Sequence, residues 1–262
     1  MGSEITLVFH MRIMLLLFLL SLCFQSSANQ CLKKPLIVGW DLYPPYGYYN
    51  PNKQLVGLDI AFLNAVLQQA NCLYEIKLIT FKRSLIELKK GSIDLMLTVS
   101  KTAAREQYAY YSPPYRDEQM RMIIRKGEQH QWPLQRLSDI KKLKMSLAVR
   151  LGSYYGEEFA GLLSDPLFRE LLIDVKQTVQ GIKMVATGRA DAALQDVYNL
   201  KYRAINLGVW DKLALHPYIV SSGKVHFMFS KKSVPQQDAK YISQNILAFK
   251  RTEAYKTIYM LD

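Results

Sequence analysis

The segment TVSKTAAREQYAYYSPPY runs from Thr98 to Tyr115 and begins inside the apolar run IDLMLTV. Such a run predicts a strand that is buried on both faces. The segment therefore starts at the carboxyl end of a buried strand, which is the edge where open α/β sheets bind ligands. Hydroxyl groups on Ser100 and Thr102 precede Arg105, whose planar guanidinium can hold a carboxylate through two hydrogen bonds. A lone arginine can equally be a solvated surface charge, so other segments must separate the two interpretations.

Strand-like and helix-like segments alternate on both sides of this stretch, which is the pattern of an α/β fold. Strands are expected at LIVGW, YEIKLI, IDLMLTV, KMSLAV, IDVK, ADAALQD and VHFMFS. Helices are expected to begin at Asp59 and Ser153, and to cover residues 84–90, 179–187, 198–204 and 235–249. No Gly/Ser-rich linker divides the chain, so the sequence favours two α/β lobes joined by extended crossings over two independent domains.

The N-terminus has the composition of a secretory signal. MRIMLLLFLLSLCFQSSA, residues 11–28, holds a basic residue, an apolar core and small residues at its end. This pattern predicts a signal over residues 1–28, cleaved after Ala28, and hence export to the periplasm. The apolar core of about a dozen residues is shorter than the roughly 20 that a membrane-spanning helix needs. Whether the chain starts at Met1 or Met11 stays open.

Removal of the signal would leave two cysteines, Cys31 and Cys72, in an oxidising compartment. A disulfide is one interpretation; a reactive thiol or a metal pair is the other. The disulfide is favoured because no histidine or acidic cluster accompanies either cysteine with metal-ligand spacing. On the loop-entropy model, such a bridge would stabilise the fold by roughly 3 to 4 kcal/mol.

The chain is basic, with 34 Lys and Arg against 22 Asp and Glu, and a formal charge of +12. These charges are interspersed and lack the basic run typical of nucleic-acid binding. A solvated basic surface is one interpretation, and attraction of anionic solutes or of an anionic membrane face is the other. No nucleophile elbow, phosphate-binding glycine loop or His-Glu-x-x-His motif occurs, so a non-enzymatic protein without cofactor or metal is expected.

Two further places favour solute recognition. The turn Leu151-Gly152-Ser153 stands between a predicted strand and a predicted helix, where free backbone N–H groups and the helix dipole attract an anion. Asp196 ends the strand ADAALQD and can hold an ammonium group. Each place also has a structural interpretation, because Ser153 and Asp196 can both be ordinary helix caps. A zwitterion buried between two lobes would need an opposite charge at each end.

In their order along the chain, these motifs resemble the extracellular solute-binding proteins of family 3, which include the amino-acid-binding components of ABC transporters. The matching segments are VGLDIAFLNAV, LKKGSIDLMLT, TAAREQYAYYSPPY, VRLGSYYGE and GRADAALQD. The resemblance implies the type II periplasmic-binding-protein fold, with two lobes that are each a mostly parallel sheet flanked by helices. Two extended crossings would form the hinge. Lobe one would hold residues 33–118 plus 222–262, and lobe two would hold residues 119–221.

The resemblance also implies roles for single residues. Arg105 would hold the α-carboxylate of the ligand, assisted by Ser100 and the backbone near Ser153. Asp196 would hold the α-ammonium, and Thr98 matches a position that adds a backbone or hydroxyl contact. The aromatic positions that wall the side-chain pocket match Tyr43, Tyr46 and Phe81.

The sequence departs from the family pattern at Lys101, Arg83 and Tyr154. Together these side chains could favour an acidic or unusual ligand, but outward-facing positions for Lys101 and Arg83 are equally compatible with the sequence. The identity of the solute is therefore open.

The main hypothesis is a monomeric periplasmic protein that captures a small zwitterion, such as a polar amino acid, for an inner-membrane ABC permease. A sensory or orphan binding module is the first alternative. A cyclohexadienyl dehydratase-like enzyme is the second, since the family fold and its arginine also support that activity. It would need an additional acid over the substrate, for which Glu157 and Glu158 are candidates.

Overall fold

The computed structural model describes residue 31 and residues 34–259. The expected signal over residues 1–28 lies outside the described residues. The strands are β1 (Leu36–Trp40), β2 (Tyr48–Tyr49), β3 (Leu55–Val56), β4 (Tyr74–Leu78), β5 (Leu95–Ser100), β6 (Ala109–Tyr111), β7 (Arg116–Arg125), β8 (Leu147–Arg150), β9 (Leu172–Val175), β10 (Ala192–Asp196) and β11 (Leu213–Ser230). The helices are α2 (Leu58–Gln69), α3 (Phe81–Lys90), α4 (Ala103–Glu106), α5 (Asp139–Leu143), α6 (Glu157–Leu162), α7 (Pro166–Glu170), α8 (Thr178–Ala186), α9 (Val197–Asn206), α10 (Gln236–Phe249) and α11 (Glu253–Tyr259).

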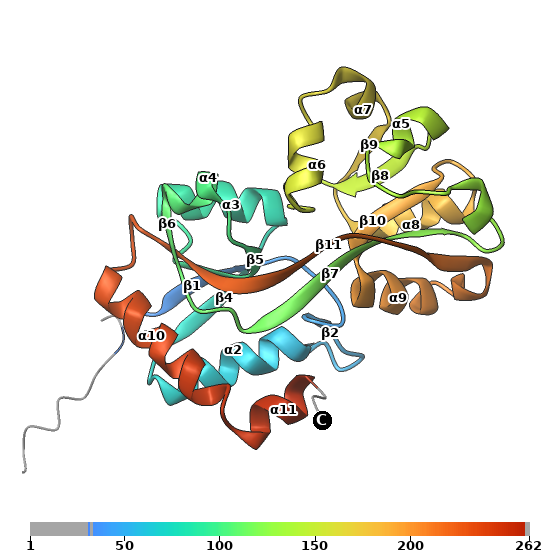
Figure 1. The fold of residues 1–262 in the computed structure, drawn as a ribbon. Coiled ribbons are helices and arrows are strands. Elements are labelled where there is room, and N and C mark those ends of the chain that lie inside the picture. The colour runs from blue at the N-terminus through green and yellow to red at the C-terminus, as the bar shows by residue number, and fades with distance from the viewer. Residues whose placement is uncertain (1–30, 32–33, 260–262) are drawn as a thin grey trace, which may run out of the picture. The chain divides into compact units, whose positions relative to one another are not determined.

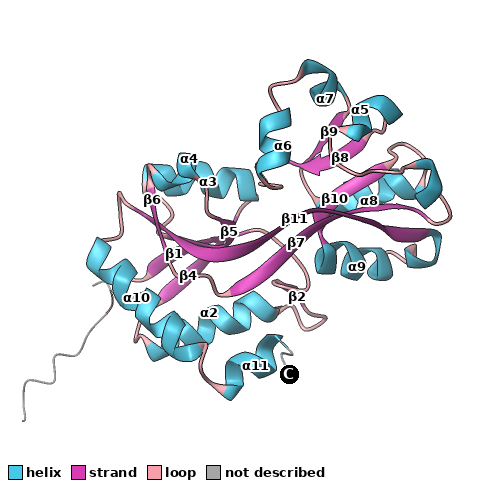
Figure 2. Ribbon diagram, viewed as in Figure 1, coloured by secondary structure: helices cyan, strands magenta, loops and turns pink. Residues whose placement is uncertain are grey.

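Nine strands form one mixed sheet in the order β4-β1-β5-β11-β7-β10-β8-β9, with β6 beside β11. Strands β4, β1 and β5 are mutually parallel, and so are β10, β8 and β9. Between these two parallel groups lie β7 and β11, which pair antiparallel with each other and with their neighbours β10 and β5. Figures 1 and 2 show these two long strands running from one group of elements to the other. The predicted α/β class with helix-flanked parallel strands is confirmed.

The buried apolar side chains form separate clusters at the two ends of the sheet. Two clusters draw on residues 31–115 and 225–259, with Phe62 in contact with aromatic side chains from α11, from β11 and from the residue just before β7. Two more clusters draw on residues 120–220, where Phe159 packs against Phe168. The carboxyl ends of the parallel strands of both groups lie between these clusters.

Helix α2 shows how the sequence positions the loop that follows β1. Its apolar residues Ile60, Leu63 and Leu67 recur at helical spacing and are all buried. Gly57 precedes the helix with φ of 135°, and a Cβ atom at this position would lie 2.5 Å from the carbonyl group of Tyr46. Only glycine allows this backbone approach, which places the loop carrying Tyr46 against the start of α2.

Two predicted elements differ from the structure. The helix expected to begin at Ser153 begins at Glu157, because Gly156 with φ of 102° is its N-cap and an irregular turn precedes it. The prediction of a helix N-terminus at Ser153 is therefore wrong. Strand β11 continues for 18 residues, whereas the sequence predicted only its last third, VHFMFS, as a strand.

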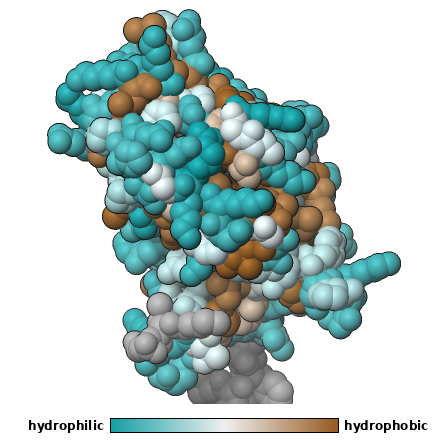
Figure 3. Space-filling model, turned by 90° about the vertical axis from the view of Figure 1, so that its right-hand side faces the viewer, coloured by the Kyte–Doolittle hydropathy of each residue, from teal (hydrophilic) through white to brown (hydrophobic). Residues whose placement is uncertain are grey.

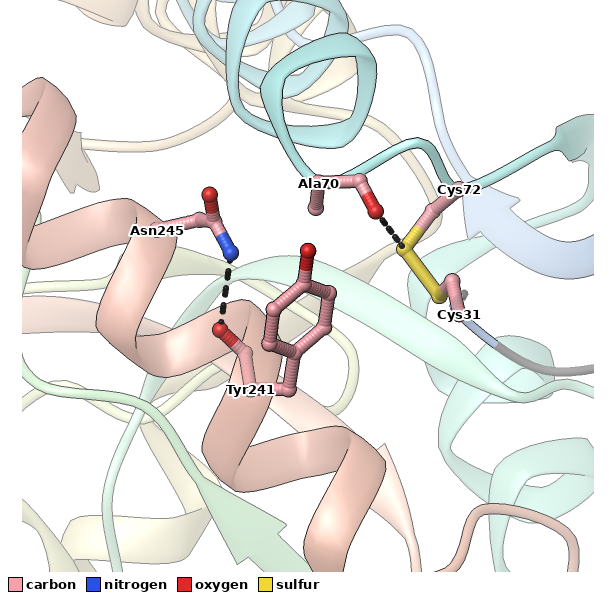
Figure 4. Close-up of a disulfide and its surroundings, with 5 residues drawn as sticks. All are labelled: Cys31, Ala70, Cys72, Tyr241 and Asn245. Carbon is pink, nitrogen blue, oxygen red and sulfur yellow. Dashed lines mark hydrogen bonds between the residues drawn. A yellow bond between two sulfur atoms is a disulfide. The ribbon is translucent and has the colours of Figure 1, made fainter. Parts of the chain in front are cut away.

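A disulfide joins Cys31 to Cys72, which confirms the predicted pairing. Both cysteines are buried, and the bridge ties the first described residue to the turn after α2. Figure 4 shows the side chain of Tyr241, from α10, pointing toward this turn. The bridge thus holds Cys31 beside the contact between α2 and α10.

The described residues include no helix long and apolar enough to cross a membrane. Within the same residues, no group of three or more His, Cys, Asp or Glu side chains could hold a metal ion. In Figure 3, hydrophilic side chains cover much of the face on the right of Figure 1, with hydrophobic ones scattered among them.

Candidate functional site

A small cavity lies at the carboxyl ends of β1, β5, β8 and β10. Its volume is about 40 Å³, measured as the space open to the centre of a water molecule. Six of the eight predicted site residues line this cavity, namely Tyr43, Phe81, Thr98, Ser100, Arg105 and Ser153. The other two, Tyr46 and Asp196, are absent from its lining.

Arg105 is a buried cation whose described partners are neutral. It lies on the short helix α4, where the Thr102 side chain caps the helix by accepting from the Arg105 backbone N–H. Its guanidinium donates to the carbonyl groups of Ser100, at 2.9 Å, and Gly152, at 3.1 Å, and no ion pair joins it to a described carboxylate. Burial lowers the pKa of Arg105. A carboxylate entering the cavity would supply the counter-charge that this guanidinium lacks.

The turn before α6 meets Arg105 through a carbonyl group, which differs from the predicted anion site. The Gly152 carbonyl accepts from Arg105, and the Ser153 N–H donates back to the Arg150 carbonyl at 3.2 Å. Ser153 and Tyr154 still line the cavity, so their side chains remain available to a ligand. The free N–H groups expected at a helix start belong instead to the residues after Gly156.

An ion pair that the sequence did not predict forms a second side of the cavity. Arg150, at the end of β8, donates to Asp41, just after β1, and both residues line the cavity. The same Asp41 oxygen accepts from the backbone N–H of Phe81 at 3.0 Å. The Arg150 guanidinium carbon lies 5.3 Å from the ring centroids of both Tyr43 and Phe81. The Arg150 charge is therefore held by one carboxylate and two aromatic rings.

Further contacts join the loop after β1 to the elements around β10. The Tyr43 hydroxyl donates to Gln195 at 3.1 Å, and the Arg203 side chain donates to the Leu42 carbonyl at 2.8 Å. The Asn199 amide donates to the Pro44 carbonyl at 2.5 Å. The cavity is thus closed on one side by hydrogen bonds between segments more than 150 residues apart in the sequence.

Asp196 acts as the N-cap of α9 in this structure. One carboxylate oxygen accepts from the backbone N–H groups of Tyr198 and Asn199 and from the Tyr46 hydroxyl, at 2.9 to 3.1 Å. The other oxygen is buried and has no described hydrogen-bond partner. Burial raises the pKa of the Asp196 carboxyl. The capping role, one of the two interpretations of this residue, is therefore present, and one oxygen remains for a further donor.

Glu118 is an acid in the cavity that the sequence did not single out. It lies on β7 and lines the cavity beside Ser100, Arg105 and Tyr154. Burial is the main cause that raises the pKa of Glu118 to about 8; within that net value the Arg116 charge lowers the pKa and the Asp196 and Asp59 carboxylates raise it. Its segment, RDEQ, looks like an ordinary solvated strand, so the sequence carried no signal for this role.

Thr98 connects the cavity to a buried charge network. Its φ of 58° is unusual for a β-branched residue. Its hydroxyl donates to Asp59 at 2.6 Å, and its N–H donates to the Tyr115 hydroxyl at 3.1 Å. Asp59 in turn pairs with Arg116 through two hydrogen bonds. The hydroxyl expected to contact a ligand is thus already engaged with Asp59.

Lys101 and Arg83 both lie outside the cavity lining. The Lys101 side chain is 49% exposed and pairs with Glu106, while the Arg83 side chain is 59% exposed and pairs with Glu87. The outward-facing interpretation of both residues is therefore correct, and Tyr154 is the only one of the three departures from the family pattern that lines the cavity.

This sheet topology, with a cavity at the carboxyl ends of two parallel strand groups, matches the fold of the type II periplasmic binding proteins. The family model "Bacterial extracellular solute-binding proteins, family 3" matches residues 36–260, so the chain belongs to this family. The family resemblance inferred from the sequence is confirmed.

Two curated relatives are amino-acid-binding proteins. The "Probable ABC transporter arginine-binding protein ArtJ" of Chlamydia trachomatis is 24% identical over 199 residues, which is 72% of this chain and 74% of the relative. The "Probable amino-acid-binding protein YxeM" of Bacillus subtilis is 24% identical over 198 residues, covering 75% of this chain and 71% of the relative.

Solved structures with the same fold have varied functions. The arginine-, lysine-, histidine-binding protein ArtJ from Geobacillus stearothermophilus has a TM-score of 0.71 at 23% identity, covering 86% of this chain and 94% of that protein. A histidine kinase sensor domain has a TM-score of 0.74 at 17% identity, covering 87% and 95%. The ancestral amino acid-binding protein AncCDT-1, a precursor of cyclohexadienyl dehydratase, has a TM-score of 0.71 at 19% identity, covering 86% and 94%. These similarities support the fold alone.

Proposed function

We propose that this protein binds a small carboxylate-bearing solute, such as an amino acid, in the cavity around Arg105 and delivers it to an ABC permease. The observation that carries the proposal is the buried Arg105 guanidinium, whose only described hydrogen-bond acceptors are two carbonyl groups. A buried cation without a counter-charge destabilises the protein, and a bound carboxylate would remove this penalty. Ser100, Ser153 and Tyr154 stand around the same space and would complete the contacts.

The proposed mechanism is closure of two lobes on the solute, with residues 33–118 plus 222–262 in lobe one and residues 119–221 in lobe two. The division of the core into clusters from these two parts of the chain supports it. So does the pairing of β7 with β11, the two strands that would cross between the lobes. Hydrogen bonds such as Arg105 to Gly152 would form on closure, and the loss of water would strengthen them.

The remaining predicted residues would act at the edges of this cavity. The unpartnered oxygen of Asp196 is available for a ligand ammonium, and Tyr46 would orient this carboxylate through its hydrogen bond. Tyr43 and Phe81 would form the aromatic walls. Export to the periplasm, a cognate inner-membrane permease and a monomeric state belong to the same proposal. The names of the relatives make arginine, lysine and histidine part of any first solute panel.

A thermal-shift screen of the mature protein against amino acids and small carboxylic acids tests the proposal. A solute at 100 times its dissociation constant should stabilise the protein by about 2.7 kcal/mol. Arg105→Ala should abolish the shift, whereas Lys101→Ala, which removes an exposed cation outside the cavity, should preserve it. Retention of the shift in a folded Arg105→Ala protein would contradict the site assignment. Asp196→Ala should also abolish the shift for zwitterions, with circular dichroism as the check that α9 is intact.

A second candidate function is a dehydratase reaction on a cyclohexadienyl acid, and Glu118 is the observation that favours it. This reaction needs an acid that can deliver a proton to the leaving hydroxyl group, and an acid with a pKa of about 8 is protonated at neutral pH. Glu158 is less suited, because it accepts from the Leu137 N–H and the Tyr218 hydroxyl. Turnover of a cyclohexadienyl acid that disappears in Glu118→Gln would favour the enzyme over the binding protein.

A further inference from the structure

The pair of Arg150 and Asp41 has the geometry of a bound guanidinium group. The Arg150 guanidinium donates to the Asp41 carboxylate and lies over two aromatic rings, each with its centroid 5.3 Å away. The Arg150 side chain is only 7% exposed, and that of Asp41 only 9%. An acidic group flanked by Tyr43 and Phe81 is a favourable site for any cation, since ring faces and a carboxylate both attract positive charge. Here the cation comes from the chain itself.

Asp41 and the rings of Tyr43 and Phe81 form a cage around the Arg150 guanidinium. The position of this cage relative to Arg105 determines which part of a bound solute would reach it. Phe81 is shared, because the Arg105 guanidinium carbon also lies 5.9 Å from its ring centroid. A solute whose carboxylate is held by Arg105 would therefore direct its side chain toward Phe81 and the cage. A lysine or arginine side chain reaching this place would meet the Arg150 charge instead of a free carboxylate.

We propose that Arg150 fills the cation subsite of the cavity, so that the protein binds small neutral or acidic carboxylate solutes and rejects solutes with a basic side chain. This inference rests on the proposed function, since it names the class of solute that the Arg105 cavity admits. Arg150 would act as a specificity-determining residue, because it both fills the subsite and neutralises the Asp41 carboxylate.

The charge and size of the cavity agree with this assignment. The charged side chains that line it are Asp41, Glu118, Arg105 and Arg150. Asp41 balances Arg150, and Glu118 is largely protonated at neutral pH, which leaves the charge of Arg105 for the ligand. The space in the cavity that is open to the centre of a water molecule is about 40 Å³, enough for a few water-sized groups without a change in the lining side chains. A long basic side chain would require Arg150 to leave its cage.

The wild-type protein provides the first test, by thermal shift with one panel at equal concentrations. The panel contains glycine, L-alanine, L-serine, L-glutamine, L-glutamate, acetate and lactate as admitted solutes, and L-arginine and L-lysine as rejected ones. We expect at least one admitted solute to raise the melting temperature and both basic amino acids to leave it unchanged. A shift with L-arginine or L-lysine as large as the best admitted solute would overturn the inference and leave the proposed function standing.

Replacement of Arg150 provides the second test. Arg150→Met keeps an unbranched side chain but frees the Asp41 carboxylate, so we expect L-arginine affinity, measured by calorimetry, to rise by about tenfold or more over wild type. The double variant Asp41→Asn with Arg150→Met should lose this gain. Lys101→Ala is the matched control, because it removes an equal charge from an exposed site and should leave L-arginine affinity unchanged.

The measurement on Arg150→Met also allows failure of this inference to be distinguished from failure of the proposed function. If no solute shifts the wild-type protein, the proposed function is contradicted for these solutes, and the L-arginine response of Arg150→Met decides the inference alone. No gain in that folded variant would overturn it. If Arg150→Met does not fold, as judged by circular dichroism, the wild-type panel decides.

Discussion

The buried carboxylate of Asp59 accepts five hydrogen bonds, one of them from Thr98 in the cavity lining. Its replacement by asparagine tests how much this buried charge contributes to the stability of the fold. Arg116 binds this carboxylate through two hydrogen bonds of 2.9 and 3.0 Å, and the hydroxyls of Thr98, Tyr115 and Tyr259 donate to it as well. The side chains of Asp59 and Arg116 are 0% and 6% exposed. Asp59→Asn keeps the shape but removes the charge and one of the two acceptor oxygens.

The expected loss of stability follows from what remains in the variant. Arg116 stays buried without a counter-charge, and breaking a buried ion pair in this way typically costs about 3 to 5 kcal/mol. For a protein of this size, each kcal/mol lowers the melting temperature by roughly 2 to 4 °C, so we expect a fall of about 6 to 20 °C. The effect should be large because Arg116 also stacks 3.7 Å from the ring centroid of Tyr46 and cannot swing out to water without leaving that contact.

Urea unfolding followed by circular dichroism measures this loss, with two companion variants. Asp59→Asn with Arg116→Met removes both charges and should recover part of the stability, because no unpaired charge remains. Lys101→Ala breaks an exposed pair with Glu106 and should change the midpoint little. A loss below about 1 kcal/mol in Asp59→Asn, or a double variant less stable than the single one, would refute the buried-charge argument.

Two further predictions concern other groups. Because the folded-state pKa of Glu118 is raised to about 8, folding favours its protonated form, and wild-type stability should fall relative to Glu118→Gln as the pH rises from about 4.5 to 8. A difference in the free energy of unfolding between the two proteins that stays constant across this pH range would contradict the raised pKa. Reduction of the Cys31–Cys72 bridge opens a loop with a sequence separation of 41 residues and should cost about 4 kcal/mol on the loop-entropy model, measured by urea unfolding with and without reductant. A Cys31→Ser, Cys72→Ser protein as stable as the oxidised wild type would argue against this contribution.

Much of the fold could be predicted because it depends on local patterns. The buried run IDLMLTV and the helical spacing of Ile60, Leu63 and Leu67 are visible in the sequence, and both elements occur where they were expected. The start of α6 could not be predicted, because Ser153 is a good cap by type while Gly156 is the residue with the backbone conformation that the turn requires. Only the last third of strand β11 was predicted, since pairing with β7 extends the strand through a segment without a clear strand pattern.

The candidate site was predicted from residue types at strand ends, and the misses share one physical reason. Arg105 could be found because it follows a buried strand, but Arg150 and Asp41 each look like an ordinary charge at a strand end, and 109 residues separate them. What distinguishes them is that they neutralise each other beside the rings of Tyr43 and Phe81, an arrangement that only the folded chain brings about. The same holds for Glu118, whose proton affinity comes from burial and not from its neighbours in the sequence. Sequence order thus shows where charges gather, whereas the charge left free for a ligand depends on pairings across the cavity. In this protein Arg150 neutralises Asp41. The solute panel measured on the wild type and on the Arg150 variant is therefore the most direct test of the specificity of the cavity.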